Sequence, residues 1–377
     1  MTAPPPSSDA VGRRRPPGAG TTLLQLVLPV EPDRRELARM REAAAGVADW
    51  PGIVAQAEVH GLAPLLYRNL RNADADVPHT AQRQLRALYA RHRHANAMRL
   101  EALEEILVRF EQCGIEALVL KGAALCKVLY PEPALRPMSD LDILVRRSDG
   151  PGAQAVLREL GYRAADHHNK RTMRRHHHLP AADRLQGGVR VVVEVHQDAL
   201  ARDCPASLPW AGWSRPPRRV RLATTTARVL GHEDMLWHLC WHAILPAARL
   251  RRIWLVDIVS YADRFAPEID WRVLHQRYGF VIHMLSMIHF AIPLPPAVRA
   301  HVPLVPGPAP AGVGVVHKPL SAIFFSRRGL RDRFADLFYP SDWWLRTYYS
   351  RPEGSLAGCR WFRHPWELCR WCLRRLR

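Results

Sequence analysis

Cysteine is scarce in this chain, and its distribution argues against a disulfide framework. The 377 residues include seven cysteines, an odd number scattered from Cys113 to Cys372. Small secreted domains held by disulfides carry cysteines in even number at close spacing. We therefore expect a protein of a reducing compartment and a cytoplasmic location. The single C-x-x-C pair, Cys369 and Cys372, has no second pair with which to form a four-thiolate zinc site.

A hydrophobic run long enough to cross a membrane is also missing. The most apolar stretch, FVIHMLSMIHFAI at 280–292, contains two histidines and is followed by Pro293. It is shorter than the roughly 20 residues that span about 30 Å of hydrocarbon. Near the N-terminus, LLQLVLPV follows an arginine-rich stretch but has no small-residue cleavage site. We expect no transmembrane segment and interpret residues 1–22 as a disordered leader.

Two common nucleotide-binding motifs are absent. The sequence contains neither a P-loop nor a complete G-x-G-x-x-G, because GVGVV near residue 312 lacks the final glycine. The sequence therefore offers neither motif as a phosphate-binding site.

Acidic residues are too few to balance the basic ones. The sequence has 54 Lys and Arg against 35 Asp and Glu, so its formal net charge is +19. This charge favours an anionic partner, either a nucleotide, a nucleic acid or an acidic membrane surface. An arginine-rich proteome would produce the same excess, so the charge alone does not select a function.

The chain is long enough for several domains, and 48% of its residues are hydrophobic. Apolar residues recur at helical spacing before and after a stretch in which short strands and helices alternate. The final part is first rich in proline, then basic, with alternating Trp and Arg. We therefore predict a leader, an N-terminal helical region, an α/β core, a helical domain and a basic C-terminal region, with the limits 1–22, 23–114, 115–222, 223–292 and 293–377.

Two aspartates stand at the head of the predicted strand in MSDLDILV. Asp140 and Asp142 are separated by one residue, and residues i and i+2 of a strand project from the same face. Adjacent carboxylates repel each other unless a cation neutralises them. Oxygen ligands at this spacing suit Mg²⁺ or Mn²⁺, which hold nucleotide phosphates. Taken alone, however, D-x-D more often marks a strand entrance with the first aspartate in a turn.

A third acid stands in a later strand. Glu194 lies in the middle of VRVVVEVHQD, where it shares a strand face with Val192 and His196. A third carboxylate on a neighbouring strand would complete a two-metal site. We predict that Asp140, Asp142 and Glu194 are the metal ligands and the catalytic residues.

A phosphate-binding turn is predicted upstream of the aspartates. IEALVLKG indicates a short buried strand that ends at Gly122, and AALCKVLY indicates a helix after it. The free N–H groups at the start of a helix attract phosphate oxygens. Lys121 adds a positive charge, and Arg136 can reach a phosphate or brace the aspartates. We predict that Lys121, Gly122, Ala123 and Arg136 bind the nucleotide; a solvated strand-end lysine is the alternative for Lys121.

The stretch LKGAALCKVLYPEPALRPMSDLDILV resembles the signature of a bacterial nucleotidyltransferase-like family, often described as "uncharacterised nucleotidyltransferase". That family belongs to the DNA polymerase β-like nucleotidyltransferase superfamily. DWPGIVAQAEVHGLAPLLYRNL, VEVHQD and HLCWHAILPAARLRRIWLVDIVSYADR are similar to further family segments, so the resemblance covers roughly 45–265. It implies an α+β fold, in which a small mixed sheet is flanked by N-terminal and C-terminal helical regions.

The resemblance also implies an activity. Asp140, Asp142 and Glu194 would bind Mg²⁺ or Mn²⁺, and a nucleoside monophosphate would pass from an NTP such as ATP to an acceptor. The acceptor could be a small molecule, a protein side chain or RNA, and the oligomeric state is not specified.

The turn of this chain departs from the superfamily pattern, which is usually Gly-Gly or Gly-Ser. Here the turn is Gly122-Ala123, which lacks the serine hydroxyl. Two alternatives therefore stay open. The protein could be a catalytically inactive accessory or binding protein of a biosynthetic or toxin–antitoxin-like system. It could also be a basic nucleic-acid-binding protein whose acids are structural.

Two basic segments have no assigned role. The segment 166–183 contains five histidines and four Lys or Arg residues. It predicts a basic flap over the triphosphate or the acceptor, with a solvated loop and a zinc site as alternatives. The tail CRWFRHPWELCRWCLRRLR predicts an amphipathic terminal helix that packs on the body, or a surface for bases or an anionic membrane.

Three polar residues lie within apolar helical patterns. His238 and His242 are four residues apart, and the Trp and Leu residues around them favour core packing over zinc binding. Asp257 is a lone acid in IWLVDIV. We predict that it pairs with Arg251, Arg252 or one of these histidines, since a buried charge requires a partner.

Overall fold

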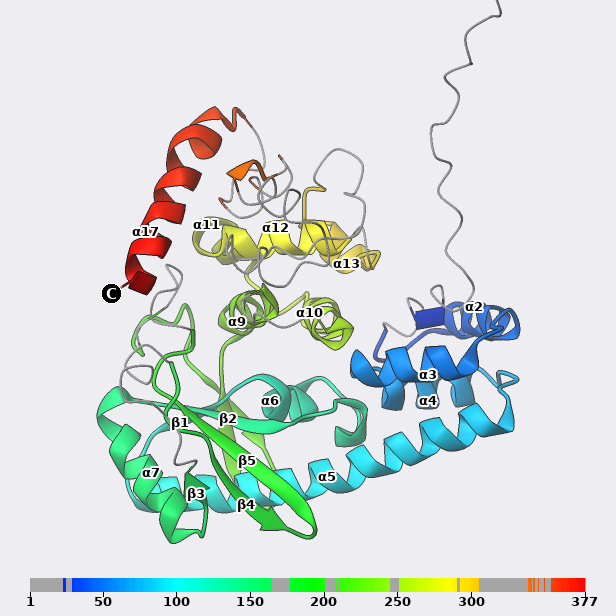
Figure 1. Cartoon of the computed structure of the whole chain (residues 1–377), viewed down its shortest axis with the longest axis horizontal. Coiled ribbons are helices and arrows are strands. Elements are labelled where there is room, and N and C mark those ends of the chain that lie inside the picture. Colours follow the sequence, from blue (N-terminus) through cyan, green and yellow to red (C-terminus); the bar gives the residue numbers. More distant parts are fainter. Residues whose placement is uncertain are drawn as a thin grey trace, which may run out of the picture.

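A computed structural model shows how these elements are arranged (Figure 1). The predicted leader lies outside the described residues, as do 166–176 of the basic segment and most of 305–353. The structure describes residues 23–24, 29–164, 177–200, 208, 210–244, 251–289, 292–304, 338–340, 342, 345, 349 and 354–376.

The N-terminal region is helical, as the hydrophobic spacing predicts. One long helix packs against two shorter ones that precede it (Figure 1). The side chain of Asp49 caps the second helix, because its Oδ1 accepts a hydrogen bond from the N–H of Gly52 at 2.9 Å. The helices are α2 (Arg34–Ala45), α3 (Trp50–Val59), α4 (Ala63–Asn72) and α5 (His79–Gln112).

A mixed sheet of seven strands forms the centre of the described chain, in the order β3-β4-β5-β2-β1-β7-β6. In its middle, β2 runs parallel to β5 and antiparallel to β1. The strands are β1 (Ala117–Val119), β2 (Asp140–Val145), β3 (Arg163–Ala164), β4 (Ala182–Gln186), β5 (Val189–His196), β6 (Arg218–Arg221) and β7 (Thr226–Val229).

One part of the sheet differs from the sequence prediction. The predicted helical domain begins at residue 223, but Thr226–Val229 forms the strand β7. This strand pairs in parallel with β1, where Val119 lies opposite Val229. Four residues are too few for a periodic pattern, so pairing with a distant strand decides their conformation. The predicted limit at 222 falls inside the hairpin of β6 and β7.

The connection between β1 and β2 is a helix and a loop. It contains α6 (Lys121–Val128) and the short η1 (Pro133–Leu135). After β2, the turn η2 (Arg147–Asp149) leads into α7 (Gly150–Glu159), which packs on α5.

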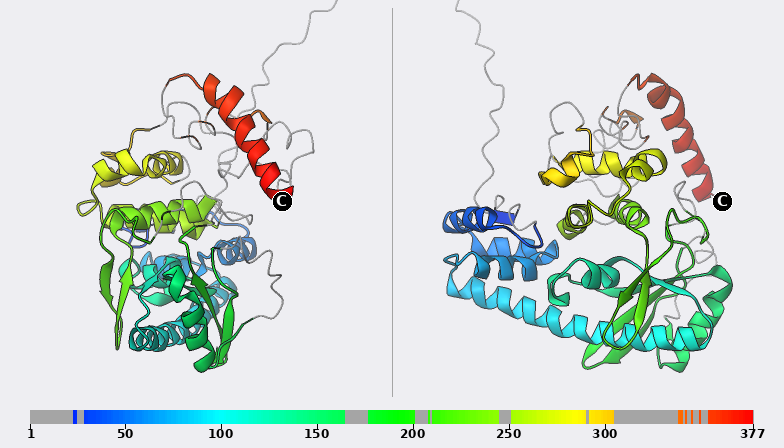
Figure 2. Two further views of the ribbon diagram at one scale, coloured as in Figure 1. Left: turned by 90° about the vertical axis from the view of Figure 1, so that its left-hand side faces the viewer. Right: turned by 180° about the vertical axis from the view of Figure 1, so that it is seen from behind.

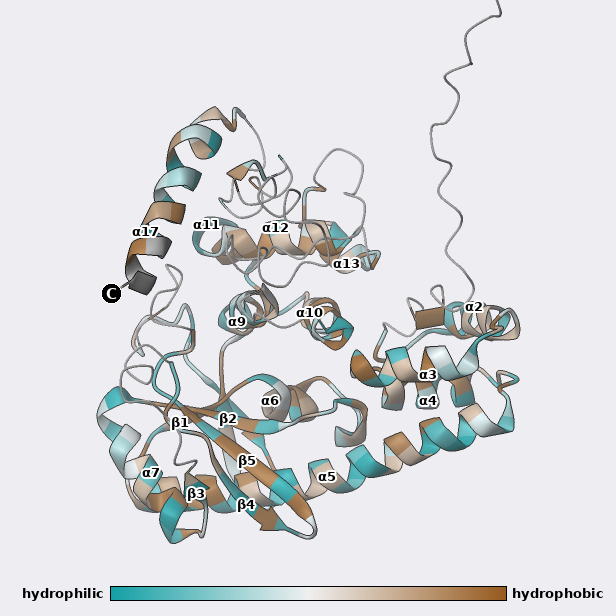
Figure 3. Cartoon of the chain, in the orientation of Figure 1, coloured by the Kyte–Doolittle hydropathy of each residue, from teal (hydrophilic) through white to brown (hydrophobic). Residues whose placement is uncertain are grey.

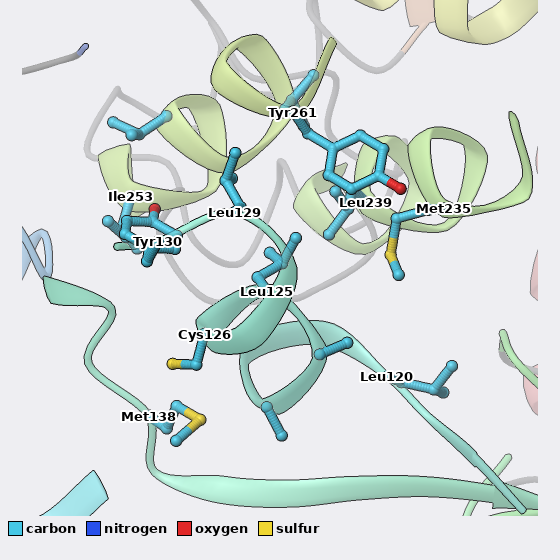
Figure 4. Packing of buried hydrophobic residues seen from close by; sticks show 14 of the residues in the cluster. Leu120, Leu125, Cys126, Leu129, Tyr130, Met138, Met235, Leu239, Ile253 and Tyr261 are labelled. Atoms are coloured by element: carbon cyan, nitrogen blue, oxygen red, sulfur yellow. The ribbon is translucent and has the colours of Figure 1, made fainter. Parts of the chain in front are cut away.

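A second group of helices covers α6. Figure 2 shows α9 and α10 as a layer between the sheet and α11 with α12. In Figure 4, Leu125 of α6 and Leu129, which directly follows this helix, face Leu239 of α9 and Ile253 of α10. Each of these side chains is buried, which stabilises the layer by about 2 kcal/mol per residue. The helices are α9 (His232–Ile244), α10 (Arg252–Arg264), α11 (Trp271–Arg277), α12 (Gly279–Ile288) and α13 (Pro296–Arg299).

The C-terminal region ends in the predicted amphipathic helix, α17 (His364–Leu376), which follows a π-helical turn at Cys359–Arg363. Leu368 is buried, whereas Trp366 on the other face is 63% exposed. The helix therefore packs through one face only.

The architecture is α+β, as predicted: a mixed sheet with helical regions before and after it. In Figure 3, apolar and polar residues alternate along α5, as expected of a helix with one face on the core. Within the described residues, no helix combines the length and the apolar composition that crossing a bilayer requires.

Candidate active site

The pairing of β2 with β5 brings the predicted acids together. In this parallel pair, Asp142 lies directly opposite Glu194. Both strands are apolar on their other face, where Leu141, Val193 and Val195 are fully buried. A slip by one residue would bury the acids and expose these side chains, so the hydrophobic face fixes the register.

A third potential ligand is His196, two residues beyond Glu194 on the same strand face. Its Nε2 lies 2.7 Å from Asp142 Oδ1 and 3.6 Å from Glu194 Oε2. Ligand atoms of Asp142, Glu194 and His196 all lie within 4.8 Å of one another. The alternation of VEVHQ already placed this histidine beside Glu194, but its role as a ligand was not predicted.

Asp140 stands apart from this compact set, although it projects from the same strand. Burial, and then repulsion by Asp142, raises its pKa, while Lys121 acts in the opposite direction. The pKa of Glu194 is lowered by the neighbouring His196, against the effect of burial. The neighbouring acids thus differ in their affinity for protons, a common property of catalytic carboxylates.

Lys121 forms an ion pair with Asp142, with Nζ 2.7 Å from Oδ1. Burial alone would raise the pKa of Asp142, but Lys121 and His196 outweigh it and hold this pKa well below its usual range. Lys121 also has a φ of 48°, in the left-handed region that residues with a Cβ rarely adopt. Such strain is concentrated at functional sites, where the surrounding structure maintains it.

Arg136 is engaged by a residue from a distant helix. Its Nη2 lies 2.7 Å from Asp257 Oδ2, and its Nε lies 2.9 Å from each of the two carboxylate oxygens. The hydroxyl of Tyr130 donates a further hydrogen bond to Asp257 at 2.6 Å. Asp257 therefore has a partner, as expected, but the predicted partners Arg251, Arg252 and the histidines were wrong.

The physical reason is distance along the chain. Arg136 precedes Asp257 by 121 residues, and only the packing of α10 over α6 brings them together. Arg136 does not brace the aspartates of β2 through any hydrogen bond among the described residues. It still lines the pocket described next, so its contact with phosphate stays a prediction.

A pocket of about 120 Å³ opens in front of Asp140 and Asp142. Its lining includes Gly122, where an added Cβ would be tightly placed. A Cβ at this position would lie 3.0 Å from Met138 Cγ and 3.6 Å from Arg136 Nη1. The pocket is lined by Lys121, Gly122, Arg136, Pro137, Met138, Ser139, Asp140, Asp142, His242, Arg251 and Trp254.

Three of the lining residues come from the C-terminal helical layer. The rings of His242 and Trp254 meet edge to face at 5.0 Å, and Arg251 stands just before α10. Core packing was predicted for His242, but its ring lines this pocket. No local signal separated Trp254 from the other tryptophans of the region.

His177 and His178 show where the described part of the basic segment 166–183 begins. Their rings lie 5.0 and 5.5 Å from that of His196. Burial, and then His196, lowers the pKa of His177 to about 3, so this ring is neutral near pH 7. The end of the segment therefore borders the acidic site, and its remainder up to residue 176 lies outside the described residues.

His238 packs in the core, as predicted, and this makes stability sensitive to acid. Neither ring nitrogen has a hydrogen-bond partner in the described part of the chain, and burial lowers its pKa from 6.5 to about 3. Below pH 6.5 the unfolded chain binds a proton here, but the folded protein does not until about pH 3. Stability is therefore lost as the pH falls between these values.

We expect His238→Leu to reduce this loss. Between pH 7 and pH 4.5, the free energy of unfolding should fall by about 2 kcal/mol less in the variant than in the wild type. Urea unfolding at the two pH values measures the difference, and the exposed His79→Gln serves as control. Equal losses in the His238 variant and the wild type would contradict the expectation.

Comparison with known proteins identifies the family of this chain. No curated protein matches the chain. The solution structure of the antibiotic-resistance factor ANT(2'')-Ia matches with 14% identity and a TM-score of 0.34, over 52% of this chain and 97% of that one. The sequence model of the family described as "Uncharacterised nucleotidyltransferase" matches residues 46–279, more than half of the chain, and this range includes all the site residues above. The chain therefore belongs to this nucleotidyltransferase family.

Proposed function

We propose that the protein is a metal-dependent nucleotidyltransferase, which moves a nucleoside monophosphate from an NTP to an acceptor hydroxyl. The observation that carries the proposal is the parallel pairing of β2 with β5, which sets Asp142 opposite Glu194. Asp140 and the start of α6 border the same pocket. Family membership supports the reaction class.

The donor set fits a divalent cation. Asp142, Glu194 and His196 offer two carboxylates and one imidazole within 4.8 Å, and Asp140 projects from the same strand. Carboxylates suit Mg²⁺ and Mn²⁺, whereas an imidazole ligand shifts the preference toward Mn²⁺. When bound, such an ion would supply positive charge to the triphosphate and acidify the attacking hydroxyl.

The start of α6 provides the contacts for phosphate. No side chain caps this helix, so the N–H groups of Gly122 and Ala123 in its first turn are available to an anion. The ammonium of Lys121 stands beside them. The pocket is smaller than the 300–1,000 Å³ of typical ligand sites. It therefore suits the triphosphate end of the nucleotide.

In this mechanism, Asp140 is the general base. The acceptor oxygen forms a bond to the α-phosphorus, and the bond from this phosphorus to the bridging oxygen breaks, so pyrophosphate leaves. Asp140 takes the proton of the acceptor hydroxyl, and its raised pKa suits this role. Trp254, at the edge of the pocket, offers a ring on which a base can stack.

Nucleotide binding tests the phosphate site. We expect Lys121→Met to weaken the binding of ATP in the presence of Mg²⁺ or Mn²⁺ by about tenfold or more, because a charge-assisted contact is lost. Lys127→Met on the same helix is the matched control, since that lysine is exposed and outside the pocket. Isothermal titration calorimetry gives both affinities.

Turnover separates the proposal from an inactive accessory protein. Pyrophosphate release from each NTP is measured with candidate small molecules, RNA or proteins as acceptors, with and without EDTA. Release that EDTA abolishes supports the enzyme. Binding of metal and NTP without release on any of these acceptors favours the accessory role, and no metal-dependent NTP binding contradicts both.

A further inference from the structure

A second, larger cavity lies on the N-terminal helical region. It has a volume of about 750 Å³ and shares no lining residue with the active-site pocket. Residues of α4 and of the first half of α5 form its walls, where the two helices run side by side (Figure 1). We call it the arginine cleft; it is lined by Tyr67, Arg68, Arg71, Asn72, His79, Gln82, Arg83, Arg86, Tyr89, Ala90, Arg93 and Glu132.

Positive charge in the arginine cleft is largely uncompensated. Five of its lining residues are arginines and one, Glu132, is acidic. The carboxylate of Glu132 already accepts a hydrogen bond from the Tyr89 hydroxyl at 2.6 Å. Arg83, Arg86 and Arg93 are exposed and have no hydrogen bond or ion pair with any described residue.

Arginines of the same helix outside the arginine cleft behave differently. Arg91 forms an ion pair with Glu58 at 2.8 Å, and Arg109 forms one with Glu159 at 3.1 Å. On α5, the arginines without a hydrogen bond or ion pair to a described residue are thus the three that line the cavity. Like charges held together without counter-charges repel, so an anionic ligand would stabilise them.

The spacing of these arginines suits a chain of phosphates. Arg86 and Arg93 follow Arg83 by three and ten residues along α5, and all three lie on one helix face. At about 1.5 Å per residue, they extend over ~15 Å. Phosphates in a stacked strand are about 3.4 Å apart along the axis, so the row spans several nucleotides and exceeds a single phosphate group.

Aromatic rings stand among the arginines. The rings of Tyr67 and Tyr89 lie 5.3 Å apart, and the guanidinium of Arg71 lies 5.7 Å from the centre of the Tyr67 ring. Basic grooves that bind single strands combine phosphate contacts with rings on which bases stack. We propose that the arginine cleft binds a single strand of nucleic acid, with its phosphates on Arg83, Arg86 and Arg93 and a base against Tyr67.

This site goes beyond the proposed transfer reaction, because binding in the arginine cleft requires neither the metal ligands nor turnover. Glu194→Gln should therefore bind a strand as the wild type does. Failure of transfer and failure of strand binding are thus separate results.

Fluorescence anisotropy of the full chain with a labelled 12-nucleotide oligouridylate tests the proposal. We expect the double variant Arg83→Gln/Arg86→Gln to bind at least tenfold more weakly. The slope of log K against log salt concentration should become shallower by about 1.4, since each phosphate contact on a single strand contributes about 0.7. The matched control Arg91→Gln/Arg109→Gln removes the same charge from the same helix and should bind within about twofold of the wild type. Equal affinities for the two double variants would overturn the proposal.

Two further binding experiments identify the chemical class of the ligand. Tyr67→Leu should weaken the binding of the oligouridylate at least about fivefold and leave the binding of inorganic polyphosphate unchanged. Polyphosphate that binds as tightly as the oligonucleotide, with Tyr67→Leu weakening neither, would overturn the assignment to nucleic acid. Binding to vesicles that contain phosphatidylserine, without binding to the oligonucleotide, would overturn it as well.

Discussion

Glu194→Gln should lower the rate of nucleotidyl transfer by about 10³-fold while the protein stays folded. The substitution keeps the size of the side chain and removes its negative charge. Glu194 has no lysine or arginine partner among the described residues, and its side chain is 24% exposed, so the folded state depends little on that charge. A metal ligand contributes several kcal/mol of transition-state stabilisation, and about 4 kcal/mol corresponds to this factor.

The comparison needs a variant with the same chemical change elsewhere. Glu111→Gln removes a carboxylate from an exposed position of α5 and should retain full activity. Pyrophosphate release at saturating NTP and metal gives the rates, and thermal unfolding shows whether each variant is folded. If the folded Glu194→Gln variant retained more than about a tenth of the wild-type rate, Glu194 would not be a metal ligand.

Asp257→Leu should destabilise the protein by about 3–5 kcal/mol, because it leaves the guanidinium of Arg136 buried without a counter-charge. Arg136 is 6% exposed and Asp257 is 1% exposed. Three hydrogen bonds from Arg136 and Tyr130 reach this carboxylate at 2.6 to 2.9 Å. The pair joins the loop before β2 to α10, so its loss also loosens the wall of the pocket in front of Asp140 and Asp142.

A double-mutant cycle separates the pair from its surroundings. Arg136→Met should cost about as much as Asp257→Leu, whereas the double variant should cost less than the two together, since neither charge is then stranded. Urea unfolding gives the four free energies. The exposed pair of Arg109 and Glu159 is the control, and Arg109→Met should cost less than about 1 kcal/mol. Additive losses at positions 136 and 257 would show that the two residues do not interact.

The sequence alone determined the local structure of this protein. The apolar residues of 78–113 recur at helical spacing, and this stretch forms α5, because a 3.6-residue period is a property of neighbouring residues. Asp49 before Pro51 is a typical helix start, and α3 begins there for the same local reason. The alternation around Asp142 and Glu194 also assigned each acid to a strand face, since strand side chains alternate regardless of the fold.

Only the tertiary structure decided which distant residues meet. The parallel register places Asp142 opposite Glu194 and brings His196 Nε2 to 2.7 Å from Asp142 Oδ1. This result depends on the strand order of the sheet. The partner of Asp257 and the strand β7 depend in the same way on elements more than a hundred residues away. Periodic patterns encode which face of an element is buried, but not against which other element it packs.

The arginine cleft shows the same division. The sequence showed an excess of basic residues but gave no reason to separate Arg83 and Arg86 from Arg91 and Arg109. Packing of α4 against α5 turns the first two toward a cavity, while Glu58 and Glu159 neutralise the others. Net charge is fixed by composition, whereas a binding surface arises only where folding leaves like charges together without partners.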